Sequence, residues 1–375
     1  MKKKEVSSKL MLVLISTLLL STIPGLLVSN QEIRISDEII DKQFPKSSSV
    51  NYVNLTGVAY DVFIRGDYAY VADFDSGLAI IDISDPTNPG TPVYEDTTGG
   101  CNGIYVSGDY AYVADGPSGL AIIDISDPTN PGAPVYEDTT GGCSGVYVSG
   151  DYAYVTTIIS GLAVINITDP TDPGTPVYEN TTGKAIDLYV SGNYAYVASE
   201  YSGLAVLDIS DPTDPGTPIY EATAGYAHDV YVSGDYAYVA DANSGLVVID
   251  VSDPTNPGTP VFEDTQGVAT AIYVSGDYAY VADYAWGLAI IDVSDPTNPG
   301  TPVVIDTIGY AWGVYMSGDY AYVADGSSGL AIIDLPPQDG NGEEFPFELI
   351  IIASVIGGVV VIAVAVVILM RRKRK

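Results

Sequence analysis

The sequence predicts an all-β fold, a seven-bladed β-propeller, and three observations carry this prediction. The sequence repeats itself every 42 residues, and each repeat holds four short strand-like runs separated by Gly, Pro and Asp turns. Such units are typical of propeller blades, whose sheets bury their faces only against neighbouring sheets. The repeated core Gly-Asp-Tyr-Ala-Tyr begins, without insertion or deletion between copies, at Gly66, Gly108, Gly150, Gly192 (with Asn for Asp), Gly234, Gly276 and Gly318.

Composition agrees with many short strands joined by tight turns. The chain is 47% hydrophobic, with 39 Gly, 24 Pro and 30 Tyr, and its formal net charge is -34. Only Arg65 and Lys184 are basic between residues 51 and 335. A surface this acidic repels phosphate, so no nucleic-acid partner is expected. Attraction of cations or basic partners, and a merely solvated acidic surface, both remain open.

The N-terminal region predicts export. Residues 1–30 have a basic start, an apolar run from Leu10 to Leu20 and then small and turn-forming residues, which is the pattern of a secretory signal peptide. No Ala-x-Ala cleavage motif is evident, so an uncleaved N-terminal anchor remains an alternative. Residues 31–50 form a polar lead-in.

The C-terminal region predicts a membrane anchor. Residues 349–370 are an uncharged run that, at about 1.5 Å per residue, spans roughly 33 Å as a transmembrane helix. The basic tail 371–375 is expected in the cytoplasm by the positive-inside rule. Residues 336–348 form a stalk linker rich in Pro, Gly and acids. The chain is thus expected to be a single-pass cell-membrane protein with its propeller outside.

One repeat illustrates the expected blade. Residues 103–106, 110–114, 120–125 and 134–138 are the expected strands, from the axis to the rim. Gly108 supplies the positive φ of the hairpin between the first two strands. Tyr110, Tyr112 and Ala114 alternate with small residues, so their rings are expected to pack against the next blade.

The linker from Ser126 to Gly132 is expected to turn through local hydrogen bonding. Asp127 suits an Asx-type turn and Gly132 a left-handed bend. Calcium binding is the competing interpretation of these repeated aspartates, and turn chemistry explains one Asp beside Pro better. The equivalent aspartates are Asp85, Asp169, Asp211, Asp253 and Asp295.

Ring closure is predicted from the two ends of the repeat array. The seventh unit ends at Leu335 after its third strand, while Asn51 to Gly57 aligns with Val93 to Gly99, a fourth strand and its following turn. Pairing this N-terminal strand with the last blade removes two exposed sheet edges. The propeller is therefore expected to span residues 51–335 as a monomer.

The repeats resemble the LVIVD-repeat family of surface-exposed β-propellers. The resemblance implies the fold and a cell-surface setting, and it carries over no catalytic residue. The motif appears as Leu-Ala-Ile-Ile-Asp or a close variant, starting at Leu78, Leu120, Leu162, Leu204, Leu246, Leu288 and Leu330.

Two loops differ among otherwise near-identical repeats. They are the connection into each blade and the loop between its second and third strands, which share one face in a propeller. Aromatic and aliphatic residues gather there, as is typical of recognition surfaces, although neutral drift is the competing explanation. The candidate ligand-binding residues are Tyr60, Asp61, Phe74, Ile158, Tyr201, His228, Asp229, Tyr284, Trp286 and Trp312.

Two covalent modifications are suggested by the sequence. Cys101 and Cys143 occupy equivalent positions in neighbouring blades, where a disulfide is compatible with an oxidising compartment, and two free thiols are the alternative. The sequons at Asn54, Asn166 and Asn180 predict a glycoprotein.

The expected function is that of a binding or adhesion module for an extracellular protein or glycan. A structural envelope component is the alternative, and an enzyme at the channel mouth is less favoured because the chain has one histidine. His228 with Asp61, Asp187 and Asp229 suggests a speculative cation site, against which His228 is a simple polar rim residue. No metal or cofactor is predicted.

Overall fold

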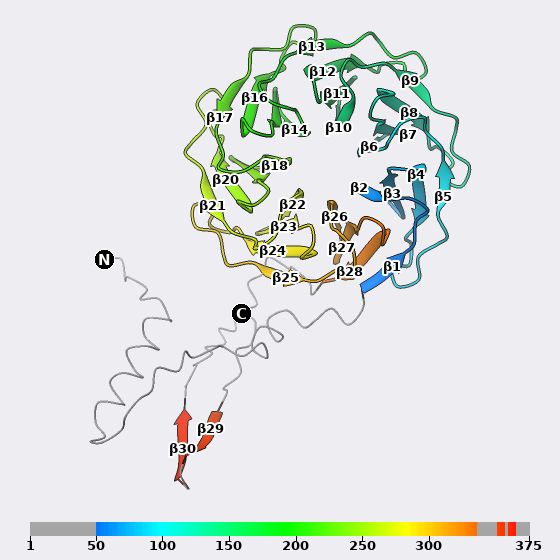
Figure 1. Ribbon diagram of the computed structural model, residues 1–375. Helices are drawn as coiled ribbons and strands as arrows, with labels where there is room; N and C mark the ends of the chain where they lie inside the picture. Colours follow the sequence, from blue (N-terminus) through cyan, green and yellow to red (C-terminus); the bar gives the residue numbers. More distant parts are fainter. Residues whose placement is uncertain (1–49, 336–350, 357–358, 365–375) are drawn as a thin grey trace, which may run out of the picture. The chain divides into compact units, whose positions relative to one another are not determined.

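The computed structural model describes residues 50–335, 351–356 and 359–364. Within the first range, seven four-stranded antiparallel sheets are arranged radially around a central axis (Figure 1). The predicted seven-bladed propeller is confirmed, with one strand of each sheet at the axis and one at the rim.

Blades 1 to 6 take four consecutive strands each, and blade 7 takes three. The strands of blades 1 to 3 are β2 (Ala59–Arg65), β3 (Tyr68–Asp73), β4 (Gly77–Asp82), β5 (Val93–Glu95); β6 (Gly103–Ser107), β7 (Tyr110–Ala114), β8 (Leu120–Asp124), β9 (Val135–Glu137); β10 (Cys143–Ser149), β11 (Tyr152–Thr157), β12 (Gly161–Asn166), β13 (Val177–Glu179). Those of blades 4 to 6 are β14 (Asp187–Ser191), β15 (Tyr194–Ala198), β16 (Leu204–Asp208), β17 (Ile219–Glu221); β18 (Asp229–Ser233), β19 (Tyr236–Ala240), β20 (Leu246–Asp250), β21 (Val261–Glu263); β22 (Ala271–Ser275), β23 (Tyr278–Ala282), β24 (Leu288–Asp292), β25 (Val303–Ile305). Blade 7 consists of β26 (Gly313–Ser317), β27 (Tyr320–Ala324), β28 (Leu330–Asp334) and β1 (Val50–Val53).

Side chains alternate across each sheet as the sequence predicts. In blade 2, Tyr112 is only 3% exposed and lies in the core shared with blade 3, whereas Ala111 and Val113 are buried in the core shared with blade 1. Each pair of neighbouring blades therefore encloses its own apolar layer, and burial of these layers is what holds the ring together.

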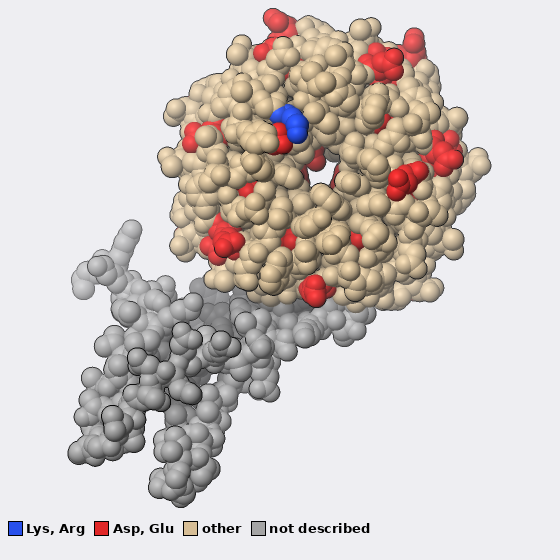
Figure 2. Space-filling model, viewed as in Figure 1, with Lys and Arg blue, Asp and Glu red and all other residues tan. Residues whose placement is uncertain are grey.

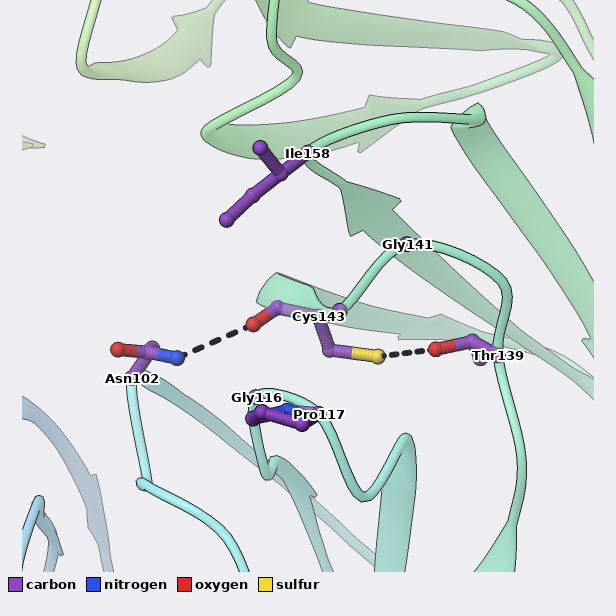
Figure 3. Close-up of a pocket in the computed structure, with 8 residues that line it drawn as sticks. Asn102, Gly116, Pro117, Thr139, Gly141, Cys143 and Ile158 are labelled. Carbon is purple, nitrogen blue, oxygen red and sulfur yellow. Dashed lines mark hydrogen bonds between the residues drawn. The ribbon is translucent and has the colours of Figure 1, made fainter.

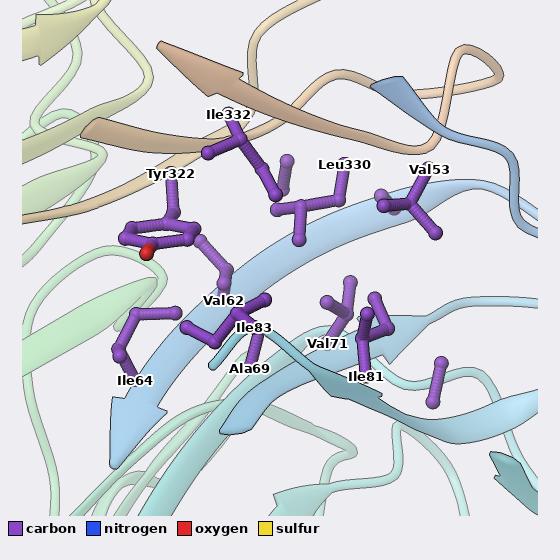
Figure 4. Packing of buried hydrophobic residues seen from close by; sticks show 13 residues of the cluster. Val53, Val62, Ile64, Ala69, Val71, Ile81, Ile83, Tyr322, Leu330 and Ile332 are labelled. Carbon is purple, nitrogen blue, oxygen red and sulfur yellow. The ribbon is translucent and has the colours of Figure 1, made fainter. Parts of the chain in front are cut away.

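The N-terminal strand closes the ring, as predicted. β1 pairs antiparallel with β28, with Val50 opposite Ile333 and Tyr52 opposite Ala331. The Tyr52 hydroxyl accepts a hydrogen bond from the Ile308 backbone N–H at 3.1 Å, which ties the strand to the preceding blade. Figure 4 shows the core between blades 7 and 1, where Val53, Leu330 and Ile332 pack beside Val62 and Val71.

The predicted turns are confirmed with one exception. Gly108 has a φ of 55°, and the Asp127 carboxylate accepts hydrogen bonds from the N–H and hydroxyl of Thr129 at 3.0 and 2.6 Å. The left-handed bend expected at Gly132 is wrong, because its φ is not positive. Gly132 is required by close packing instead: a Cβ there would lie 3.2 Å from the Asp124 Cβ.

The C-terminal apolar run is described only in part. Its described residues form two strands, β29 (Ile351–Ile356) and β30 (Val359–Val364), paired antiparallel. The helix expected over 349–370 is therefore not confirmed, and no described residues form a helix long and apolar enough to cross a membrane. The expected signal peptide 1–30, the lead-in up to residue 49, the stalk 336–348 and the tail 371–375 lie outside the described residues.

Candidate binding face

The two variable loops of each blade meet on one face of the propeller, as predicted. Backbone hydrogen bonds join the loops directly: Phe74 N–H donates to the Val58 carbonyl at 2.9 Å, and Ala311 N–H donates to the Tyr284 carbonyl at 2.9 Å. We call the face formed by the blade-entry connections and the loops between second and third strands the variable face. The opposite face carries the Ser-Gly-Asp and Asp-Pro turns, and we call it the invariant face.

Most exposed apolar bulk lies on the variable face. Figure 2 shows a propeller face with scattered acidic groups around a central opening and one basic group beside an acidic one. The ion pair between Lys184 and Glu200, at 3.2 Å, joins the two variable loops of blade 4. Of the ten exposed large apolar side chains among residues 50–335, eight belong to this face, namely Phe74, Ile158, Ile159, Tyr201, Tyr226, Trp286, Ile308 and Tyr310.

Five aromatic rings form a continuous row across blades 1, 7 and 6, which we call the aromatic arc. Tyr60 contacts Phe74 on one side and stacks on Trp312 on the other, with centroid separations of 5.1 Å in both pairs. Tyr284 meets Trp312 edge-on at 5.0 Å and stacks on Tyr310 at 4.5 Å with an interplanar angle of 7°. Four of the five were predicted. Tyr310 was missed, although its position also varies among the repeats.

Two of the aromatic rings on this face pack directly against glycines. A Cβ at Gly100 would lie 2.6 Å from the Phe74 ring, and a Cβ at Gly267 would lie 2.6 Å from Trp286 Cδ1. Each ring therefore lies directly on backbone. Trp286 keeps 49% of its surface exposed even so, which leaves part of the indole available to a partner.

The remaining predicted residues do not join the arc. Tyr201 pairs edge-on with Tyr226 at 4.6 Å, on the side of blades 4 and 5, and Tyr226 was missed from the sequence. His228 is half-buried between the same blades, and burial lowers its pKa, which neighbouring Glu200 and Asp241 only partly offset. His228 thus lies at the entry to the innermost strand β18 (Asp229–Ser233) and favours its neutral form.

Ile158 lines a hollow of about 440 Å³ between blades 2 and 3 (Figure 3). Asn102 crosses the gap between the blades, and its side-chain amide donates to the Cys143 carbonyl at 3.1 Å. The Cys143 thiol is buried against the Thr139 hydroxyl at 2.8 Å. Burial raises its pKa to about 11, so the thiolate that would act as a nucleophile is disfavoured.

The disulfide expected between Cys101 and Cys143 is wrong, because both are free thiols. Cys101 lies in the core between blades 1 and 2, whereas Cys143 lies in the core between blades 2 and 3. Equivalent residues of a propeller face successive cores, so the inner end of blade 2 separates the two sulfurs. The Cys101 thiol instead contacts Thr97 and Asp115, and burial raises its pKa.

Three carboxylates gather on the innermost strands at the channel. Asp61 and Asp229 each reach the next blade, where their oxygens accept the N–H of Ile104 at 2.9 Å and of Ile272 at 2.7 Å. Burial raises the pKa of Asp61 to about 6 and that of Asp229 to about 7. Burial, followed by the charges of Asp229 and Asp61, holds the pKa of Asp187 well above its usual range.

The suggested cation site is therefore only partly assembled. Charge repulsion among the three aspartates raises the pKa of Asp187 and of Asp229, but His228 does not contribute to the group. No cluster of His, Cys, Asp or Glu suited to a metal ion occurs in the described part of the chain. For Asp61 and Asp229, the arrangement serves inter-blade hydrogen bonding.

A belt of seven aromatic rings surrounds the channel next to these carboxylates. Neighbouring ring centroids are 4.6 to 5.1 Å apart. The interplanar angles of 45° to 58° are close to one seventh of a full circle, which is the rotation between neighbouring blades of a seven-bladed ring. The abundance of Tyr had suggested packing between blades, and the belt is one such contact. Its members are Phe63, Tyr105, Tyr147, Tyr189, Tyr231, Tyr273 and Tyr315.

The three predicted glycosylation sites are exposed. Asn54 follows β1, Asn166 ends β12 and Asn180 follows β13. Their accessibility is compatible with modification, which stays a prediction.

Solved structures of low sequence identity share the fold. The WD40 repeats of RRP9 align with a TM-score of 0.65 at 12% identity, covering 78% of this chain and 99% of that one. The Cps50 (Swd1) β-propeller domain from Myceliophteria thermophila aligns at 0.61 and 12% identity, covering 77% and 100%. YCF48 bound to D1 peptide aligns at 0.58 and 13% identity, covering 77% and 94%.

None of the curated proteins compared with the chain matches it. The LVIVD repeat family matches residues 56–92, 98–134, 140–176, 182–217, 224–260, 266–307 and 308–335. Because these seven matches together cover more than half of the sequence, and each covers at least the first three strands of one blade, the chain belongs to the LVIVD-repeat family.

Proposed function

We propose that this propeller is a binding module that engages an extracellular protein or glycan through its variable face. The aromatic arc is the observation that carries the proposal. Five touching rings from three blades, with Trp286 exposed beside them, provide the large rigid anchors on which recognition surfaces depend. In a repeat protein whose blades are otherwise near-identical, such a row gives the face one distinct side.

The proposed setting is the outside of a cell membrane. The signal-like residues 1–30, the uncharged run 349–370 and the basic residues 371–375 support a single-pass chain with its propeller exposed. A glycosylated surface at Asn54, Asn166 and Asn180 fits the same setting. Adhesion to a neighbouring surface is one use of such a module.

Binding is favoured over catalysis. Burial raises the pKa of both thiols, which disfavours the thiolate nucleophile, and the only histidine of the chain has neither thiol nor an activated hydroxyl among its neighbouring charged groups, which are Glu200 and Asp241. A propeller of the same fold, YCF48, has been solved with a peptide bound. That precedent supports a binding role for the fold without indicating the ligand of this chain.

The test compares aromatic side chains of similar exposure on different surfaces. The purified full chain is used to capture partners from extracellular matrix and cell-surface extracts, beside Trp286→Ala, Trp312→Ala and Phe262→Ala variants. Phe262 is 46% exposed, close to the 49% of Trp286, but it lies on the rim strand β21. We expect both Trp variants to lose the captured partner and Phe262→Ala to retain it. Capture that survives both Trp changes would place the binding surface elsewhere.

A further inference from the structure

We propose that Tyr284 is the anchor of the aromatic arc and that it receives an arginine or lysine side chain of a basic protein segment. This inference rests on the proposed function and specifies its partner. Blade 6 and its surroundings combine three features that support it: backbone strain, ring stacking and the distribution of charge.

The backbone of Tyr284 is strained. Its φ is 46°, in the left-handed region, where a Cβ approaches the neighbouring carbonyl oxygen and the conformation is unfavourable. Blades 2 and 7 place Gly116 and Gly326 at the equivalent position, with φ of 51° and 59°. Glycine adopts this conformation without penalty, so the fold does not require a tyrosine here. The non-glycine residues with positive φ in the described part of the chain are Glu200, Ala242, Gln266 and Tyr284.

The strained conformation presents the ring to the arc. The Tyr284 carbonyl accepts the Ala311 N–H at 2.9 Å, which holds the backbone against the entry of blade 7. From there the ring stacks on Tyr310 and meets Trp312 edge-on. Gln266, with a φ of 74°, adjoins the glycine that seats Trp286. Two of the four strained residues thus flank the exposed aromatic side of blade 6.

The charges around the arc select the class of partner. Exposed Asp264 and Asp306 lie on the loops that carry Gln266 and Tyr310, and the face's one basic residue, Lys184, is engaged by Glu200 on blade 4. Aromatic faces attract cations, and guanidinium groups also stack on them. An aromatic row that lacks basic residues and has carboxylates beside it complements Arg or Lys side chains. A neutral glycan gains no charge attraction from these carboxylates, and an acidic partner is repelled.

The experiment separates anchoring from charge and from stability. A synthetic peptide of alternating Arg and Gly is titrated against the full chain by fluorescence anisotropy at low and high salt. We expect Tyr284→Gly to weaken binding at least tenfold, although it removes no charge, and to change the melting temperature little, because the relieved strain offsets the lost ring contacts with Tyr310 and Trp312. Ala242→Gly is the matched control, since Ala242 has the same φ of 46° in blade 5. It should raise the melting temperature and leave peptide binding unchanged.

The outcomes distinguish this inference from the proposed function. If Tyr284→Gly binds the peptide as tightly as the wild-type chain does, Tyr284 is not the anchor. If the chain captures neutral oligosaccharides independently of salt, and Trp286→Ala loses this capture, the partner is not a basic segment. That result would still support binding through the variable face. Partner capture insensitive to Trp286→Ala and Trp312→Ala would overturn the proposed function itself.

Discussion

The replacement of Asp187 by Asn should stabilise the propeller at neutral and alkaline pH. Asp187 accepts only the Leu188 N–H, at 2.8 Å, and an asparagine oxygen can accept the same bond. The change removes one of three mutually repelling carboxylates at the channel. Asp61 and Asp229 are unsuitable for this test because each accepts two backbone N–H groups, and an amide would leave one of them unpaired.

The expected size follows from the raised pKa values. A carboxyl whose pKa is higher in the folded than in the unfolded state contributes stability that is fully present below the unfolded pKa and is lost as the pH rises through the folded pKa. For Asp229 that window runs from 3.8 to about 7, equivalent to on the order of 4 kcal/mol. Asp187 shifts in the same direction. Burial is the main cause of these shifts and charge repulsion the smaller one, and solvent at the partly exposed channel reduces both, so we expect Asp187→Asn to gain about 1–3 kcal/mol at pH 8 and almost nothing at pH 4.

Thermal unfolding followed by circular dichroism between pH 4 and pH 8 measures the effect. A gain of that size raises the melting temperature by roughly 2–6 °C in a domain this large. Asp235→Asn is the matched control, because the equivalent turn of blade 4 already carries Asn193. It should be neutral at every pH. A gain from Asp187→Asn that is equal at pH 4 and pH 8, or a loss at pH 8, would refute the electrostatic reasoning.

Three further predictions concern ring closure, the core and the thiols. Tyr52→Phe should cost about 1 kcal/mol in urea unfolding, similar to Tyr220→Phe, because the Tyr220 hydroxyl accepts the equivalent bond, from the Thr182 N–H at 2.6 Å, at an internal blade. A much larger loss for Tyr52 alone would show that closure depends on this one bond. Leu330→Ala, which empties a fully buried site between blades 7 and 1, should cost about 2–5 kcal/mol by the same measurement, and a cost below 1 kcal/mol would contradict the packing described. Cys101 and Cys143 should both react with iodoacetamide after denaturation without reductant and be protected in the native chain, whereas a bridged pair would react only after reduction.

Local sequence chemistry explains why the fold was predictable. The hairpin at Gly108 and the Asx turn at Asp127 depend on residues a few positions apart, so their geometry can be predicted without the rest of the chain. Gly132 was misinterpreted because two physical needs, positive φ and close approach, both select glycine. The approach of Asp124 to this glycine arises only in the folded blade.

The site was less predictable because its contacts join residues far apart in sequence. The loop positions of Tyr60, Tyr284 and Trp312 were evident from variation among the repeats, but not that these rings touch one another while Tyr201 lies apart with Tyr226. Blade order around a closed ring decides which loops are neighbours, and it brings the first repeat beside the last.

By itself, the sequence determined the number of blades, their strands and the closure by the N-terminal strand, because period, alternation and turn residues act over short distances. Only the tertiary structure decided that Cys101 and Cys143 face different cores, that Asp187 sits among other carboxylates and that Tyr284 is strained within an aromatic row. These properties arise from the packing of one blade against the next, which brings together side chains that belong to different blades.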